Sequence, residues 1–280
     1  MASIFSRYSA RNPGCLALLV LFAAMFAGGG PALAQQPDRL AELIAGKQRS
    51  PGNVARDVYR NPWEALKFLG LADTSRVVEA LPGSGAYWTE IIAPWVKDKG
   101  LYIAAGRDPT VPPQYLEDHR RMLAKYAADP ATFGKVEVRP FVSDKYEVAD
   151  AGSADFVLTF RNMHNWIDRD ELTGALKVFF RALKPGGIFG VADHRGPPDA
   201  SMESLMKSGY VRQDMAIALI EKAGFRLIGT SEVKANPKDT KNYPEGVWTL
   251  PPTYRLGDVD RAKYAAIGES DRFLLKFLRP

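Results

Sequence analysis

The sequence predicts an α/β fold, in which a mostly parallel sheet carries helices on both faces. Three observations support this prediction. Residues 76–92 combine a short β-branched strand, a glycine turn and a helix. Residues 154–160 are almost continuously apolar, as in a strand that is buried on both faces of a parallel sheet. Strand-like and helix-like segments alternate along the rest of the chain, which is the pattern of βαβ units.

Length and charge limit the classes of protein to consider. The 280 residues are enough for one large domain or two small ones. The formal net charge is +5, but Arg7 and Arg11 lie in a segment that we expect to be removed. Their removal leaves 35 basic against 32 acidic residues, a charge of +3. With no long run of Lys or Arg, a nucleic-acid partner is not expected.

Residues 1–34 have the features of a secretory signal peptide. Two arginines precede an apolar run at residues 15–27, and an Ala-Leu-Ala site predicts cleavage after Ala34. The alternative is an uncleaved membrane anchor, but the run is shorter than the ~20 residues that span a bilayer. Cys15 is the sole cysteine, so the processed protein has no disulfide and no thiolate metal site. We expect a periplasmic or secreted protein without stable membrane insertion.

Residues 35–70 are expected to form a helical lead-in that caps the core, before a main domain at residues 71–280. Helical spacing ends at Gly46, and a second amphipathic helix ends at Gly70. The polar residues of interest in the lead-in are Arg56, Asp57, Tyr59 and Arg60.

The first strand and its glycine turn form the most informative corner of the chain. Val77 and Val78 suit a buried strand, and residues 82–85 form a strong turn signal. A helix follows whose N-terminal N–H groups point over the loop, and Pro94 is expected to kink it or to end it near residue 93. Glu79, near the carboxyl end of the strand, can accept hydrogen bonds from ligand hydroxyl or amino groups. A sharp connection without a ligand is an equally open alternative.

The next elements bring a second polar group to the edge of the sheet. Strands are expected at residues 101–105, 136–139 and 154–160, with a helix within residues 110–133. The amides of Asn162 and Asn165, the imidazole of His164 and the indole of Trp166 follow the strand at 154–160 directly. Open parallel sheets bind ligands at the carboxyl ends of their strands, so this cluster predicts a site. The alternative is a pair of turn amides and a structural histidine.

The remaining elements complete the alternation. A helix is expected at residues 168–183, then a turn at 184–187 and a strand at 188–192 that ends in Asp193, His194 and Arg195. A helix at residues 211–223 and a strand from residue 225 follow. Residues 234–264 form a proline-rich insertion loop, which is either functional or disordered. The last strand is expected at residues 272–277.

The glycine corner resembles the first motif of the class I S-adenosylmethionine (SAM)-dependent methyltransferases. Glu79, Gly83 and Gly85 match the acid and the last two glycines of that motif, whereas Leu81 stands where the first glycine is expected. The Leu-Lys-Pro-Gly-Gly sequence at residues 183–187, followed by a strand, is also typical of the family. More narrowly, residues 82–90, 160–166, 193–195 and 271–277 resemble a group of exported, predicted methyltransferases.

The resemblance implies a Rossmann-like class I methyltransferase fold: a mostly parallel seven-stranded sheet with helices on both faces and an antiparallel last strand. It also implies SAM as the cofactor and an unidentified, small-molecule methyl acceptor. The cofactor-binding residues that it implies are Glu79, Pro82, Gly83, Ser84, Gly85, Tyr87, Asp108 and Asn162. Asp108 is displaced into a turn after the second strand, where a purely turn-forming role is the alternative.

Catalytic roles are expected for His164, His194 and Arg195. Either imidazole is a competent base near neutral pH, and the guanidinium group suits an anionic substrate. The three histidines lack metal-ligand spacing, so no metal site is expected.

Two other classes of protein are compatible with parts of the sequence. A ligand-binding protein of the periplasm that keeps this fold without catalysis is the main alternative, because Leu81 and Asp108 depart from the family pattern. An NAD-dependent oxidoreductase ranks last, since Trp88 occupies the position of the third glycine in Gly-x-Gly-x-x-Gly. The atom that is methylated and the oligomeric state are left open.

Overall fold

The computed structural model describes residues 38–83, 85–106, 108, 110 and 113–280. The predicted signal peptide of residues 1–34 and the cofactor candidate Ser84 lie outside these described residues. Within the described ranges, no helix combines the length and the apolar character needed to cross a membrane.

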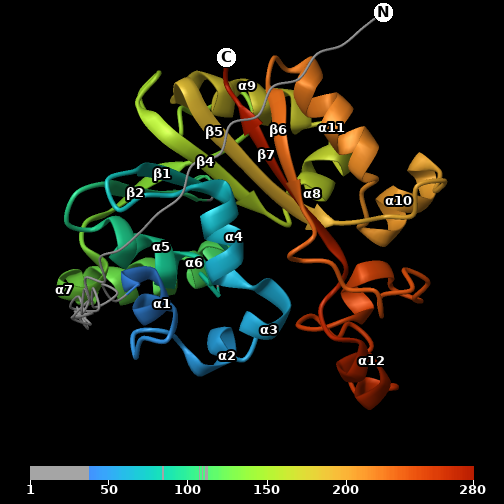
Figure 1. Ribbon diagram of the computed structural model, residues 1–280. Coiled ribbons are helices and arrows are strands. Elements are labelled where there is room, and N and C mark those ends of the chain that lie inside the picture. The colour runs from blue at the N-terminus through green and yellow to red at the C-terminus, as the bar shows by residue number, and fades with distance from the viewer. Residues whose placement is uncertain (1–37, 84, 107, 109, 111–112) are drawn as a thin grey trace, which may run out of the picture. The chain divides into compact units, whose positions relative to one another are not determined.

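The core of the fold is one seven-stranded sheet with the order β3-β2-β1-β4-β5-β7-β6 (Figure 1). Strands β1 to β5 pair in parallel, and β7 runs antiparallel to both β5 and β6. This arrangement confirms the predicted sheet with its antiparallel last strand. The strands are β1 Arg76–Ala80, β2 Leu101–Gly106, β3 Val136–Pro140, β4 Ala154–Phe160, β5 Leu183–His194, β6 Arg226–Ser231 and β7 Arg272–Leu278.

Helices pack on both faces of the sheet because successive strand residues point to opposite sides. Val77 faces one hydrophobic core and Val78 the other. The Val77 side is covered by α1 Arg39–Ile44, α4 Pro62–Leu69, α5 Thr89–Val96, α6 Pro113–Ala128 and α7 Pro130–Phe133. The Val78 side is covered by α8 Met163–Asp168, α9 Leu172–Ala182 and α11 Gln213–Lys222.

The remaining helices are short. In the lead-in they are α2 Pro51–Val54 and α3 Asp57–Arg60. Helix α10 Met202–Ser208 follows β5, and the insertion between β6 and β7 holds the 3₁₀ helix η1 Gly246–Thr249 and the start of α12 Arg261–Ile267. A small hydrophobic cluster joins α10 to η1 through Leu205 and Val247.

Two local expectations are corrected by the structure. Of the two outcomes expected at Pro94, an end of the helix near residue 93 is excluded, because α5 continues through Pro94 to Val96. Proline lacks the N–H that would bond the Glu90 carbonyl, and the Gln48 amide donates to that carbonyl instead, at 3.4 Å. The helix expected at residues 168–183 begins only at Leu172, because Met163–Asp168 forms the separate helix α8.

Candidate functional site

A cavity of about 320 Å³ lies at the carboxyl edge of the sheet, where open parallel sheets bind ligands. We call it the corner cavity. Because β1 and β4 are parallel neighbours, the residues that follow them emerge at the same edge. Helix α3 and the insertion complete the lining, which consists of Arg56, Arg60, Glu79, Pro82, Gly83, Gly85, Ala86, Tyr87, Trp88, Phe160, Arg161 and Pro252. Five of the predicted cofactor residues are therefore brought together: Glu79, Pro82, Gly83, Gly85 and Tyr87.

The backbone of the corner after β1 turns through residues with positive φ. Gly83 has a φ of 73°, and a Cβ added there would meet nothing within 4 Å, so backbone conformation rather than crowding favours glycine. Leu81 has a φ of 50°, a conformation that costs a non-glycine residue roughly 1–2 kcal/mol. Its N–H donates to the Ala105 carbonyl at 2.8 Å, and its side chain packs on the core. Packing thus holds Leu81 in a conformation that the expected glycine would adopt freely.

Glu79 presents a buried carboxyl group to the corner cavity. The Tyr102 hydroxyl donates to Oε2 at 2.6 Å and lies 2.8 Å from Thr89 Oγ1. Burial raises the pKa of Glu79 to about 7, against the opposing effects of the Tyr102 hydrogen bond and the positive charge of Arg60. A cation bound beside this carboxyl group would favour its ionised form. The charge of Glu79 therefore responds to a ligand near neutral pH.

Aromatic side chains form the walls of the corner cavity and are held in place by other contacts. The Tyr87 hydroxyl donates to Asp57, which also pairs with the Arg49 guanidinium group. Trp88 stacks on Phe160, with ring centroids 4.3 Å apart and an interplanar angle of 21°. These contacts fix both aromatic residues of the loop beside the cavity rather than inside it.

One buried carboxylate gathers three arginines next to the corner cavity. Glu269 Oε1 lies 2.5 Å from Arg56 Nε, and Oε2 lies 3.2 Å from Arg60 Nε and 2.5 Å from Arg272 Nη2. Burial opposes ionisation, but the positive charges of the three arginines hold the pKa of Glu269 below its usual range. The Lys234 ammonium lies 4.5 Å from the centre of the Trp88 ring, and burial places its pKa well below the ordinary value.

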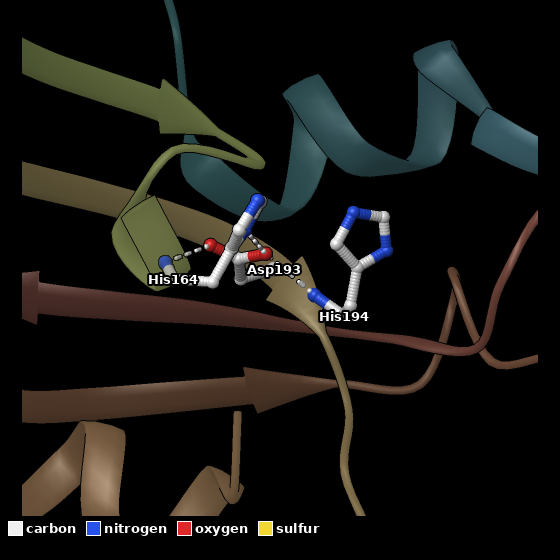
Figure 2. A group of neighbouring side chains, drawn as sticks. All are labelled: His164, Asp193 and His194. Carbon is white, nitrogen blue, oxygen red and sulfur yellow. Dashed lines mark hydrogen bonds and ion pairs between the residues drawn. The ribbon is translucent and has the colours of Figure 1, made fainter. Parts of the chain in front are cut away.

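A histidine–aspartate pair lies at the end of β5 (Figure 2). Asp193 is fully buried, and its oxygens lie 2.9 Å from His164 Nδ1 and accept the backbone N–H groups of His164 at 3.1 Å and His194 at 2.8 Å. When Nδ1–H donates to the carboxylate, Nε2 of His164 is the ring nitrogen that can accept a proton. His194 lies against the Ser270 hydroxyl, and burial holds the pKa of its imidazole well below the ordinary value.

His164 lines a different hollow from the corner cavity. This recess of about 10 Å³ is bordered by Met202, Met206 and Met215. His164 and Arg161 nevertheless belong to the same short segment after β4. The two predicted functions, cofactor binding and proton transfer, therefore use neighbouring but separate hollows.

His164, Asp193 and His194 form a group that could hold a metal ion, with one ligand atom each within 4.8 Å of one another. Zinc ligands bind at about 2.0–2.2 Å, so these groups would have to move closer together. The Asp193 oxygens already serve the three nitrogens described above, and the positive charge of nearby Arg272 reaches His194. Both features disfavour a divalent cation, and we do not propose one.

The other predicted site residues are engaged outside the lining of the corner cavity. Asp108 accepts from the backbone and hydroxyl of Thr110 and pairs with Lys145 at 2.8 Å, and the Lys145 hydrogen bond lowers its pKa. The Asn162 amide donates to the Ala80 carbonyl at 3.0 Å and so ties β4 to the corner after β1. Arg195 pairs with Glu232 at 2.7 Å and donates to the Arg272 carbonyl at 3.0 Å.

Several residues of the site were not singled out from the sequence. Asp193 was visible as part of the segment 193–195 at a strand end but was given no role, and Glu269 and Lys234 lie in segments without a recognisable motif. What marks these three residues is that each carries a charged side chain that the fold buries. Burial depends on contacts between distant segments, so the sequence does not reveal it. Glu269, for example, pairs with Arg60, 209 positions earlier in the chain.

No protein-family model matches the chain, and no curated protein matches it. Several solved structures are similar to this chain. A SAM-dependent methyltransferase from Aquifex aeolicus has a TM-score of 0.55 at 17% identity, over 88% of this chain and 100% of that one. Phosphoethanolamine N-methyltransferase 2 from Haemonchus contortus, in complex with S-adenosyl-L-methionine, has a TM-score of 0.54 at 15% identity, over 86% and 56%. The [4+2]-cyclase SpnF has a TM-score of 0.55 at 14% identity, over 86% and 92%.

The chain has the class I methyltransferase fold. Because a protein named as a cyclase shares this methyltransferase fold, the activity of the present chain must be argued from its own site.

Proposed function

We propose that this protein is a SAM-dependent methyltransferase that acts on a small molecule. The observation that carries the proposal is the corner cavity of about 320 Å³, which lies over the β1 turn of a methyltransferase fold. Its residues fit the cofactor. Glu79 offers a carboxyl group to an amino group, and Gly83 leaves the backbone bare. The Nη2 atom of Arg56 is buried without a partner among the described residues, and it suits a carboxylate.

The chain's own residues would act by positioning, by excluding water and by holding a proton. SAM would supply a methyl group activated by its sulfonium. The stacked Trp88 and Phe160 would shield that side of the cavity from water and help to hold the acceptor in line. His164 Nε2 would accept the acceptor's proton while Asp193 orients the ring. This role requires an acceptor that extends from the cavity to His164, three residues after Arg161.

Other site residues stay predictions within this proposal. Ser84 is assigned to the cofactor loop, and Asp108 and Asn162 to cofactor contacts at the strand ends. His194 and Arg195 remain candidates for proton transfer and for orienting the substrate. Each of them needs its own substitution, because the corner cavity is not lined by the side chains of Asp108, Asn162, His194 or Arg195.

Calorimetry of the purified protein with SAM tests the proposal, together with transfer of labelled methyl groups to a panel of small carboxylates, phosphates and amines. Glu79→Gln should weaken SAM binding about 10- to 100-fold, because a hydrogen bond to a charged group contributes about 1.5–3 kcal/mol. The control Glu203→Gln changes an exposed carboxylate on α10 and should leave binding unchanged. Absence of SAM binding to the wild type would overturn the proposal. Binding without transfer would support the ligand-binding alternative.

We also propose that the protein is exported and that residues 1–34 are its signal peptide. The charged start, the apolar run and the Ala-Leu-Ala site support this proposal. Mass spectrometry of the protein from the periplasm or medium should show an N-terminus at Gln35. A mature protein that begins at Met1, or that is recovered only from the membrane, would contradict it.

A further inference from the structure

The corner cavity carries more positive charge than the described residues neutralise. Arg56, Arg60 and Arg161 line it, and Arg272 borders a narrow continuation of about 10 Å³ that shares Arg60 and Arg161 with it. We call these four residues the arginine cluster. Glu269 is the carboxylate that pairs with three of them. Glu79 is a weak counter-charge, since burial raises its pKa to about 7.

Several N–H groups of the arginine cluster have no partner. Arg60 is only 4% exposed, yet its Nη2 is buried without a hydrogen bond to any described residue. The same holds for Arg56 Nη2. Across the described ranges, the Arg161 guanidinium group has neither a hydrogen bond nor an ion pair, and it feels the charges of Glu269 and Asp193 only at a distance. The two buried Nη2 donors are costly unless a ligand satisfies them, and the half-buried Arg161 beside them is free to bind the same ligand.

The cations also repel one another. Burial lowers the pKa of Arg161 to about 10, and the positive charge of Arg272 adds to this effect. The pKa of Arg60 is lowered by burial and then by the charge of Arg161. An anion placed among these groups would relieve both the desolvation cost and the repulsion. The planar fork of each guanidinium group matches the paired oxygens of a carboxylate or a phosphate.

The cofactor of the proposed function would not remove this excess. SAM carries one carboxylate, and its amino group and sulfonium both bring further positive charge. At least one guanidinium group of the arginine cluster would therefore remain without a counter-ion beside the methyl donor. The stacked rings of Trp88 and Phe160 lie at the same place and offer an apolar wall to the body of a small molecule.

We propose that the methyl acceptor carries a carboxylate or a phosphate, which Arg161 binds together with the unpaired donor of Arg60. This inference rests on the proposed function, because it assigns the acceptor of that same site. It also makes a separate claim about binding: the corner cavity takes up anions whether or not it transfers methyl groups.

Calorimetric titrations with inorganic phosphate and with acetate, each with and without saturating S-adenosylhomocysteine, test the inference. The wild type should bind at least one of the two anions in both states. Arg161→Gln should weaken that binding about 10- to 100-fold, the range expected for a charge-assisted hydrogen bond. The matched control Arg169→Gln makes the same change at an exposed arginine on the C-terminal side of α8 and should bind the anion like the wild type.

Folding of the variant can be checked independently. Arg161→Gln removes a half-buried charge that has no ion-pair partner among the described residues, so its melting temperature without ligand should equal or exceed that of the wild type. Added phosphate or acetate should raise the melting temperature of the wild type and of Arg169→Gln, but not that of Arg161→Gln.

The outcomes separate this inference from the proposed function. If S-adenosylhomocysteine binds but neither anion does, or Arg161→Gln binds both anions normally, the acceptor inference is overturned while SAM binding stands. If Arg161→Gln loses S-adenosylhomocysteine and keeps anion binding, Arg161 serves the cofactor instead and the inference is wrong. If an anion binds through Arg161 and no SAM compound binds, the anion site stands and methyl transfer falls.

Discussion

Two parts of the candidate site lie at the same edge of the sheet but differ in how their polar groups are satisfied. Around Asp193, both carboxylate oxygens are used by nitrogen atoms of His164 and His194. Around the corner cavity, Nη2 of Arg56 and of Arg60 is buried without a described partner. A satisfied network fixes side chains in advance, whereas unsatisfied donors mark the place of a ligand. We infer that the first part orients a general base and that the second part binds a ligand.

The largest expected effect concerns the oriented base. His164→Ala should lower methyl transfer about 10²- to 10⁴-fold, the usual contribution of a positioned general base. It should leave SAM affinity unchanged, since His164 lines the smaller recess and not the corner cavity. Turnover of whichever panel acceptor the wild type methylates, together with calorimetry, measures the two effects.

Two further variants control this experiment. Asp193→Asn keeps the size of the side chain but removes the charge that orients His164, so it should lower turnover and shift its pH dependence. Asn165→Ala alters the same helix without touching either part of the site and should behave like the wild type. If His164→Ala methylated the acceptor at the wild-type rate, His164 would not be the general base.

The next effect concerns the carboxylate that holds the arginines. Glu269→Gln leaves Arg56, Arg60 and Arg272 without their ion-pair partner, and breaking a buried pair in this way costs about 3–5 kcal/mol. Denaturant unfolding should show a loss of this size, partly restored by added phosphate. Glu245→Gln is the control, because its pair with Arg255 is partly exposed and should contribute less than about 1 kcal/mol. If Glu269→Gln and Glu245→Gln had the same free energy of unfolding, the ion pairs of Glu269 with the three arginines would not stabilise the fold.

The pH dependence of stability tests Glu79. Its pKa rises from 4.5 in the unfolded chain to about 7 in the folded protein, so the folded state holds an extra proton between these values. The contribution of Glu79 to stability is therefore complete below pH 4.5 and is lost as the pH rises through about 7. The loss should be at most about 3 kcal/mol. Glu79→Gln should show a correspondingly smaller decrease in unfolding free energy from pH 5 to pH 8, and identical profiles would refute the raised pKa.

The sequence predicted the sheet well because its signals are local. The apolar run of β4 and the β-branched residues of β1 mark buried strands by composition alone. The path of α5 was harder to predict, since Pro94 is accommodated by Gln48, a residue far outside the helix. Leu81 follows the same rule: its positive φ is held by β2 and the core, which a motif does not reveal.

The site was predictable only where it follows the motif. Glu79 and Gly83 lie in the glycine corner and line the cavity together. Glu269, in contrast, is important because it forms ion pairs with arginines of the lead-in and of β7. No spacing in the sequence predicts these pairs. Charged residues of this kind become visible only when the fold shows which of them are buried.

The smallest expected effect concerns Asn162, which the family resemblance assigns to cofactor binding. Its amide donates to the Ala80 carbonyl at 3.0 Å and to Thr159 Oγ1 at 3.1 Å. Asn162→Ala should therefore lower the unfolding free energy by about 1–2 kcal/mol and weaken SAM binding only a few-fold, through the corner that it supports. Calorimetry and denaturant unfolding of the same preparation separate the roles. A variant of normal stability that has lost SAM binding would show that Asn162 contacts the cofactor as well as supporting the corner after β1.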